Sequence, residues 1–196
     1  MWSSPMVPAN CNRCGGTHSV ETYPSINTAL DPELKARVRD GSLFVWECPS
    51  CGTRNLLKYQ TLYHDPGEKL MVWLLPGDAQ PPAAVADAVK DLEGYTLRLV
   101  REVGDLVEMC KYVTRLEMAD KQGRPDLQDV PLKFFKMDGP DNDLVFSFPL
   151  DGEMKVVNVG FHVYEDARGI LGRHPSVRPE PGFAQIDAAW LGQYFR

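Results

Sequence analysis

A long hydrophobic run is the first feature that this sequence lacks. The longest apolar stretch, residues 70–75, is far shorter than the roughly 18 residues that a membrane-spanning helix needs. Residues 1–10 contain neither the basic region nor the apolar region of a secretory signal peptide. We therefore expect a soluble protein of the cytoplasm that does not enter a membrane.

An excess of basic residues is also lacking. The chain has 21 Lys and Arg residues against 27 Asp and Glu residues, which gives a formal net charge of −6. Residues 1–75 carry seven basic and seven acidic groups, so 14 of the 21 basic and 20 of the 27 acidic groups follow them. Because neutralising phosphates supplies most non-specific affinity for nucleic acid, this balance disfavours DNA or RNA as a partner.

The motifs of several enzyme classes are absent as well. The sequence has no phosphate-binding loop, no nucleophile elbow and no dinucleotide-binding fingerprint. It also has no internal repeat and no low-complexity segment. With 196 residues, 43% of them apolar, the chain can still bury a substantial core as one large domain or two small ones.

Four of the five cysteines form two Cys-x-x-Cys knuckles, each followed directly by a glycine. Two intervening residues let both sulfurs of a tight turn reach one ion, and the glycine lets backbone N–H groups point at the sulfurs. Two such knuckles complete a tetrahedral shell without an open position, as in a structural zinc site. We therefore predict a zinc ribbon that binds one zinc ion per chain. The predicted ligands are Cys11, Cys14, Cys48 and Cys51.

Two alternatives to zinc stay open. A Cys-Pro-x-Cys-Gly knuckle, as at residues 48–52, also suits a single iron ion. Either pair could instead be a redox-active dithiol, although such a site needs one pair at the start of a helix in a βαβ unit, and neither pair has that setting. The spacing of the cysteines agrees with a reducing compartment, since a secreted disulfide framework would show wider spacings and an even count.

The segment between the knuckles carries signals for a helix and a strand. Asp-Pro-Glu at residues 31–33 offers an N-cap, a proline at the first helical position and an acidic first turn. These signals predict a helix over residues 32–40 that ends at Gly41. Residues 43–46 contain strand formers and lead directly into the second knuckle.

Strands and helices alternate irregularly along the rest of the chain, which predicts an α+β fold. Turn signals at residues 65–67 and 151–152 predict two hairpins. The linker candidate at residues 76–82 divides a ribbon module at 9–76 from an α+β remainder at 77–196, and we expect the two to pack as one unit. The expected strands cover residues 19–25, 43–46, 55–63, 69–75, 95–101, 143–150 and 154–164. The expected helices cover residues 32–40, 105–116 and 126–136, with one more after the linker and a last one capped by Asp187.

The expected helices also predict which apolar side chains share a face. Val85, Val89 and Leu92 share one face of the helix after the linker, which Gly94 closes. Cys110 lies on the apolar stripe of the helix at residues 105–116, where it is most simply a small core residue. In the last helix, the side chains expected to dock on the core are Trp190, Leu191 and Tyr194.

The ribbon and its surroundings resemble a known family. The segments that carry the resemblance are Ser25-Ile26-Asn27, Asp31-Pro32-Glu33-Leu34-Lys35, Gly41-Ser42-Leu43-Phe44, Cys48-Pro49-Ser50-Cys51-Gly52 and Leu62-Tyr63-His64-Asp65. Their order and spacing are similar to those of the CpXC domain family of bacteria and archaea, closely over residues 11–75 and more loosely to residue 116. The resemblance implies a metal at the two knuckles and a shared fold, and it supplies no reaction, substrate or catalytic residue.

Few residues outside the cysteines suggest chemistry. His64 followed by Asp65 could form an acid–base pair or a second metal site, but Asp65 also opens the predicted turn and His64 ends the predicted strand. His18 could compete as a ligand or lie beside the metal shell. We expect His162 on the exposed face of a strand and His174 in a loop. The acidic segment at residues 138–143 lacks the alternating pattern of a calcium loop and predicts a polar turn.

Two functions from different classes fit these features. The first is a non-enzymatic zinc-binding module that presents side chains to a protein partner, with Tyr23, Trp46, Tyr59 and Tyr63 as aromatics that could serve the contact or fill the core. A nucleic-acid variant would use Arg13, Arg54 and Lys58 around the knuckles, against an even local charge. The second is a metal-dependent enzyme with His64 as a base or ligand. The sequence leaves the oligomeric state open.

Overall fold

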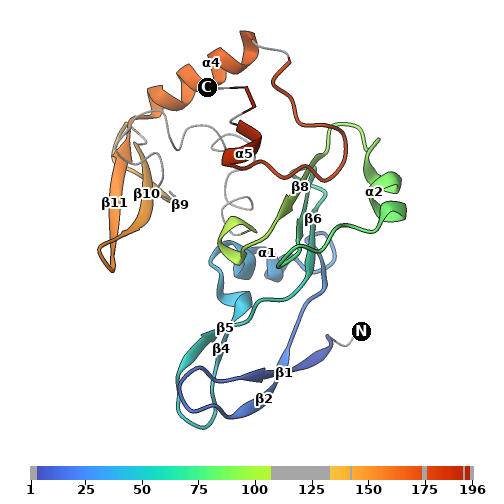
Figure 1. Cartoon of the computed structure of the whole chain (residues 1–196), viewed down its shortest axis with the longest axis vertical. Coiled ribbons are helices and arrows are strands. Elements are labelled where there is room, and N and C mark those ends of the chain that lie inside the picture. The colour runs from blue at the N-terminus through green and yellow to red at the C-terminus, as the bar shows by residue number, and fades with distance from the viewer. Residues whose placement is uncertain (1–3, 107–132, 142, 174–175, 192, 195–196) are drawn as a thin grey trace. The chain divides into compact units, whose positions relative to one another are not determined.

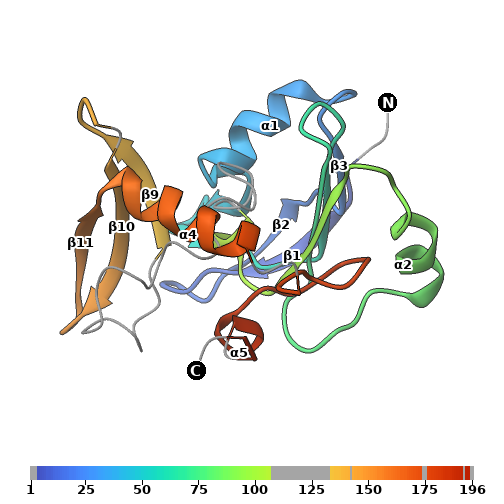
Figure 2. The same cartoon turned by 90° about the horizontal axis from the view of Figure 1, so that it is seen from above.

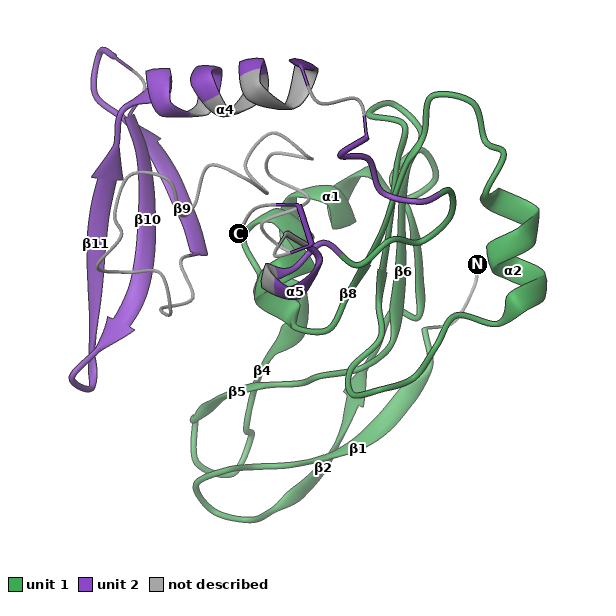
Figure 3. Ribbon diagram, turned by 45° about the horizontal axis from the view of Figure 1, so that its top comes forward, with its two compact units in different colours: residues 1–110, 181–185 green, residues 111–180, 186–196 purple. Residues whose placement is uncertain are grey.

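The computed structural model describes residues 4–106, 133–141, 143–173, 176–191 and 193–194 (Figure 1). The chain divides into two compact units, coloured separately in Figure 3. Unit 1 comprises residues 1–110 and 181–185, and unit 2 comprises residues 111–180 and 186–196. The described parts mix strands and helices, so the predicted α+β class is confirmed. The division of the chain at residue 76 into a ribbon module and an α+β remainder stays a prediction.

Two short hairpins form the ribbon part of unit 1. β1 (Met6–Asn10) pairs antiparallel with β2 (Thr17–Glu21), and β4 (Val45–Glu47) pairs antiparallel with β5 (Arg54–Leu56). Each hairpin closes on one cysteine knuckle, because both knuckles lie between the paired strands. The four-cysteine cluster therefore belongs to the N-terminal strands of the chain.

The predicted helix between the knuckles is present as α1 (Pro32–Arg39). Proline occupies its first turn, but the side chain of Asp31 makes no capping hydrogen bond. Gly41 ends the segment with φ 78°, a left-handed conformation that glycine adopts without strain. The strand predicted from residue 43 is wrong at its start, because Ser42–Phe44 forms a 3₁₀ turn. A strand would turn successive side chains to opposite faces, whereas this turn lets Leu43 and Phe44 both be buried.

A mixed four-stranded sheet follows the ribbon and is ordered β3-β6-β7-β8. Its strands are β3 (Ser25–Asn27), β6 (Thr61–Asp65), β7 (Leu70–Leu74) and β8 (Thr96–Val100). β6 and β7 form the predicted antiparallel hairpin, while β3 joins β6 and β8 joins β7 in parallel. The expected strand at residues 55–63 is split, since residues 54–56 pair with the ribbon strand β4 instead.

Both parallel pairs need a crossover connection, and each crossover carries a helix. α1 lies in the β3–β6 crossover, and α2 (Ala83–Val89) lies in the β7–β8 crossover. Figures 1 and 2 show the two helices on opposite sides of the sheet, as expected for right-handed crossovers between strands of opposite direction. The helix predicted to run through Leu92 is too long, because α2 ends at Val89. No residue of α2 is buried, and Val85 is 37% exposed.

Each face of this sheet has its own layer of side chains. Alternation along the strands places Thr61, Tyr63 and Asp65 of β6 on the α1 side, where all three are buried. The opposite face carries a cluster that includes Trp73, Leu75 and Leu99, with Leu62 and Phe183 packed against it. Residues 181–185 therefore return to unit 1 from a distant part of the sequence, and the N–H of Leu99 donates to the carbonyl of Ala184 at 2.9 Å.

Unit 2 contains an antiparallel sheet of β9 (Lys133–Asp138), β10 (Asp143–Leu150) and β11 (Glu153–Val159). The predicted turn between the last two strands is confirmed, with positive φ at Asp151 and Gly152. One face buries an apolar cluster of Phe134, Leu144, Phe146, Phe148, Val157 and Val159. The predicted helix at 126–136 is wrong over residues 133–136, which belong to β9, and its earlier residues lie outside the described chain.

The C-terminal helices differ from the prediction in two respects. The predicted strand at residues 154–164 ends at Val159, and α4 (Phe161–Arg173) follows. The N–H of Val163 donates to the carbonyl of Gly160 at 3.0 Å and closes the first helical turn. α5 (Ala188–Leu191) starts as predicted, since the N–H of Trp190 donates to Asp187 Oδ1 at 2.8 Å. The predicted docking of Tyr194 on the core is wrong, because this side chain is 38% exposed, whereas Trp190 is half-buried.

The predicted helix at residues 105–116 lies largely outside the described residues, as does Cys110. Among the helices that are described, none is both long enough and apolar enough to span a lipid bilayer.

Candidate metal centre

The two cysteine knuckles have the same backbone geometry. In the first, the N–H of Gly15 donates to the carbonyl of Cys11 at 2.9 Å, and in the second the N–H of Gly52 donates to the carbonyl of Cys48 at 2.8 Å. Both glycines have positive φ, 70° and 68°. An L side chain rarely adopts this conformation, so the glycine after each knuckle has a local cause. The repeated turn brings both sulfurs of each pair to the same side.

The four cysteine sulfurs meet in one cluster, with all Sγ atoms within 4.8 Å of one another. Cys11 Sγ lies 3.5 Å from Cys51 Sγ, and Cys14 Sγ lies 3.7 Å from Cys48 Sγ. These contacts join the two knuckles, and all four cysteines are free of disulfide bonds. A metal with four sulfurs at about 2.3 Å has sulfur–sulfur edges of about 3.8 Å. The spacing of the cluster therefore fits a tetrahedral metal site.

Polar groups around the cluster are arranged to stabilise thiolates. The backbone N–H of Arg13 donates to Cys11 Sγ at 3.4 Å, and Asn55 Nδ2 donates to the same sulfur at 3.6 Å. Thr53 Oγ1 lies 3.4 Å from Cys51 Sγ. This hydroxyl, followed by the backbone N–H of Thr53, lowers the pKa of Cys51. Donors of this kind orient metal-bound thiolates and offset part of their charge.

The pKa values of Cys11 and Cys14 shift in opposite directions because the two sulfurs have different hydrogen-bonding surroundings. Hydrogen bonding from the backbone of Cys14, and then of Arg13, lowers the pKa of Cys11 to about 6 against the effect of burial. The N–H of Gly16 lowers the pKa of Cys14, but hydrogen bonds with Cys48 and the other cysteines outweigh it and raise that pKa to about 11. Four adjacent thiolates repel one another, and a bound cation removes that repulsion. The sulfur cluster thus has the chemistry of a metal site.

The cluster lies at the edge of a small apolar core. Cys11 and Cys48 are buried with Ala9 and Trp46, while Cys14 is exposed. Val20, Cys51 and Leu57 pack against this group. So few apolar side chains provide little stability of their own, and a bound metal would connect the two hairpins beside this small core.

Asn55 is the residue of this site that the sequence did not reveal. It is only 3% exposed, and its Oδ1 accepts a hydrogen bond from the backbone N–H of Asn12 at 2.9 Å. Its Nδ2 also donates to the carbonyl of Thr53 at 2.8 Å. One side chain therefore joins both knuckles. A strand asparagine four residues after a cysteine has no distinctive signal, because its contact with residue 12 depends on tertiary structure.

His18 lies beside the cluster, one of the two placements that the sequence left open. Its Nε2 is 3.5 Å from Cys48 Sγ and 3.3 Å from Ser50 Oγ, and its ring packs on Trp46 with centroids 6.0 Å apart. With four cysteines already within reach of one ion, His18 is a neighbour of the sulfur shell that can donate a hydrogen bond to Cys48.

The structure separates His64 from the carboxylate that follows it. His64 Nε2 lies 3.1 Å from the hydroxyl of Tyr95, and burial lowers the pKa of His64. Asp65 points to the other face of the sheet, where Lys35 Nζ lies 2.7 Å away and the hydroxyl of Tyr63 donates at 3.1 Å. Asp65 is therefore engaged by Lys35 and Tyr63, and Tyr95 is the hydrogen-bonding neighbour of His64.

The remaining candidates do not gather into a site within the described residues. His162 is exposed but lies in α4, so its predicted place on a strand is wrong. His174 lies outside the described residues, and residues 138–143 connect β9 to β10. Of the four aromatics, Tyr63 and Trp46 are core residues, while Tyr23 and Tyr59 are half-buried.

The fold and the cluster define an α+β protein with a four-cysteine centre in its N-terminal hairpins. Comparison with family models identifies the family itself. The model described as CpXC protein matches residues 9–121, more than half of the chain, and the protein belongs to the CpXC family. Comparison with curated proteins and with solved structures gives no match.

Proposed function

We propose that Cys11, Cys14, Cys48 and Cys51 hold one structural zinc ion, and that the ribbon so fixed is a protein-interaction module. The observation that carries the proposal is the gathering of four sulfurs within 4.8 Å from two hairpins. Thiolate ligands select zinc or iron over hard cations such as magnesium. When bound, the zinc would be held by four thiolates without an open position, so it would supply structure and no Lewis-acid chemistry.

The interaction role rests on what surrounds the metal site. The tips of both knuckles are exposed, including Arg13, Cys14, Pro49 and Ser50, so a metal would fix a surface rather than a buried pocket. The chain carries more acidic than basic groups, 27 against 21, which supports a protein rather than nucleic acid as the partner.

Metal analysis tests the first half of the proposal. We expect one zinc per chain, and cobalt substitution should give the absorption of a tetrahedral thiolate site with strong sulfur-to-metal charge-transfer bands. The matched variant Cys48→Ser should lose both. Iron at one equivalent would replace zinc as the resident metal, and two metals per chain would contradict a single closed site.

A peptide selection tests the second half. A phage-displayed random peptide library is panned on the zinc-loaded chain, with the Cys48→Ser chain used for counter-selection. Enrichment of peptides that need the metal-loaded ribbon supports an interaction module. Failure to enrich any such peptide, or retention of nucleic acid on a filter at low salt, would count against it.

A further inference from the structure

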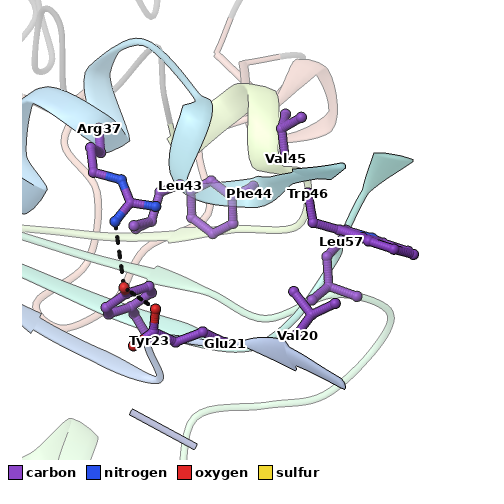
Figure 4. Close-up of a pocket in the computed structure, with 9 residues that line it drawn as sticks. All are labelled: Val20, Glu21, Tyr23, Arg37, Leu43, Phe44, Val45, Trp46 and Leu57. Atoms are coloured by element: carbon purple, nitrogen blue, oxygen red, sulfur yellow. Dashed lines mark hydrogen bonds between the residues drawn. The ribbon is translucent and has the colours of Figure 1, made fainter. Parts of the chain in front are cut away.

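A small pocket lies where the ribbon meets α1, entirely within unit 1 (Figure 4). Its cavity volume is about 130 Å³. The lining residues come from β2, the segment after β2, α1, the 3₁₀ turn, β4 and the segment after β5. They are Val20, Glu21, Tyr23, Arg37, Leu43, Phe44, Val45, Trp46 and Leu57.

Six of the nine residues that line the pocket are apolar, and the other three are polar or charged. Leu43, Phe44 and Trp46 are buried, and Val45 is half-buried. Figure 4 shows Trp46 at one end of the pocket beside Val20 and Leu57. For comparison of size alone, an enclosed apolar cavity of about 150 Å³ is large enough to hold benzene. The pocket is therefore the right size for one leucine or phenylalanine side chain.

The other end of the pocket is polar and carries both signs of charge. The hydroxyl of Tyr23 donates to Glu21 Oε2 at 2.7 Å and accepts from Arg37 Nη1 at 3.4 Å. The guanidinium carbon of Arg37 lies 5.6 Å from the centre of the Tyr23 ring. Hydrogen bonding from Tyr23 and charge from Arg37 help to keep the pKa of Glu21 below its ordinary value, so Glu21 is ionised at neutral pH. Both Glu21 and Arg37 are exposed and can contact a ligand.

A ligand that suits this end must offer a donor and an acceptor close together. A simple anion would be repelled by Glu21, and a simple cation would be repelled by Arg37. A peptide group satisfies both, since its N–H can donate to Glu21 while a carbonyl accepts from Arg37. Aromatic residues and arginine are also the side chains most often found at the energetic centre of protein interfaces.

The pocket shares residues with the metal centre. Val20, Trp46 and Leu57 line the pocket and also belong to the apolar cluster around Cys11 and Cys48. Closing the two hairpins on a metal therefore positions one wall of the pocket.

We propose that this pocket binds a peptide segment of a partner protein, with one leucine- or phenylalanine-sized side chain in the apolar part and the adjoining peptide groups between Glu21 and Arg37. The proposal rests on the proposed interaction function and names its site and the chemistry of its ligand.

The test is a titration of the ¹⁵N-labelled, zinc-loaded chain, followed by NMR. The probe is acetyl-Gly-Gly-Leu-Gly-Gly-amide, and the matched control peptide has alanine in place of leucine. We expect the leucine peptide to shift amide signals of residues 20–23, 37, 43–46 and 57, and the alanine peptide to bind at least tenfold more weakly. Shifts confined to other residues, or equal binding of both peptides, would overturn the proposal.

Charge variants test the polar end. Arg37→Gln and Glu21→Gln should each weaken binding of the leucine peptide about tenfold, because each replaces the charged partner of a hydrogen bond by a neutral one. The control Arg54→Gln removes a charge from an exposed residue that does not line the pocket and should change the dissociation constant less than twofold. If neither pocket variant weakens binding, the proposed placement of the peptide groups is wrong.

Free leucine is the last probe, because its ammonium group could pair with Glu21 and its carboxylate with Arg37. If it binds more tightly than the peptide, the pocket is an amino-acid site and the peptide proposal fails. The experiments distinguish failure of the pocket proposal from failure of the proposed function. If the chain binds zinc and the library-selected peptides but shows no shifts at the pocket residues, only the pocket proposal is wrong.

Discussion

Replacing Asn55 with aspartate should weaken metal binding without changing the size of the side chain. The carboxylate would keep the acceptor for the N–H of Asn12 but lose the donor to the carbonyl of Thr53 and to Cys11 Sγ. A negative charge would then face a thiolate at the 3.6 Å that now separates Asn55 Nδ2 from Cys11 Sγ. Asn55 is buried, so water screens this repulsion poorly.

The magnitude follows from the same geometry. Two unit charges at 3.6 Å repel by about 4–5 kcal/mol at an effective dielectric constant of 20, which is an upper bound because the metal ion and protonation of the new carboxyl group relieve part of it. Loss of a group that orients a metal ligand typically weakens metal binding by about 10- to 100-fold. We expect Asn55→Asp to fall in that range.

The assay is a competition for zinc against a chromophoric chelator at pH 7. Asn12→Ala is the matched control, because the hydrogen bond from Asn12 to Asn55 comes from its backbone N–H, which alanine keeps, and Asn12 is exposed. Circular dichroism in excess zinc should show both variants folded. An affinity within twofold of the parent chain for Asn55→Asp, or an equal loss in Asn12→Ala, would refute the role of the Asn55 amide.

Three further predictions concern the metal, the sheet and the pocket. Cys48→Ser or a chelator should raise amide exchange over residues 11–75 before it does so in β9–β11, because the free energy of metal binding stabilises the folded ribbon. Equal protection with and without the metal in hydrogen-exchange mass spectrometry would argue against a structural metal. Asp65→Asn should lower the free energy of unfolding by about 2 kcal/mol at pH 7, since it breaks the buried end of the ion pair with Lys35. Burial raises the pKa of Asp65, but Lys35, the Glu68 N–H and Tyr63 outweigh burial and lower that pKa. The stability that the ionised carboxylate contributes is therefore full above about pH 4 and disappears as pH falls through the pKa of the folded state. Equal urea midpoints of the variant and the parent chain at pH 7 would contradict this prediction. Chelation should weaken the leucine pentapeptide at least tenfold through the shared Trp46, and unchanged affinity in the same NMR titration would separate the pocket from the metal.

Local backbone rules account for the elements that the sequence predicted well. The two glycines after the knuckles, and the turns at residues 65–67 and 151–152, are determined by residues next to one another in the chain. The hairpin β6–β7 and the cap of α5 by Asp187 belong to the same class. Each depends on conformational preferences that act over fewer than six residues.

The predictions of secondary structure were wrong where the local sequence was compatible with more than one conformation. Phe161 and Val163 continue the alternation of β11, yet they form the first turn of α4 because Gly160 interrupts the strand and its carbonyl accepts from Val163. Residues 42–44 contain strand formers but turn so that two adjacent apolar side chains are buried. Leu92 continues the helical spacing of Val85 and Val89, but α2 ends at Val89, so periodicity made the predicted helix too long.

The sequence by itself determined the donor set of the candidate metal centre, because four cysteines at Cys-x-x-Cys spacing with glycines behind them specify both knuckle turns. The sequence also identified the family, through the segments that join those knuckles to the sheet. Only the tertiary structure decided that Asn55 joins the two knuckles, that Asp65 pairs with Lys35 rather than orienting His64, and that Arg37 meets Tyr23 above a pocket. The physical reason is separation along the chain: these contacts join residues 14 to 43 positions apart, and their partners are chosen by the packing of whole strands and helices, which local preference does not encode.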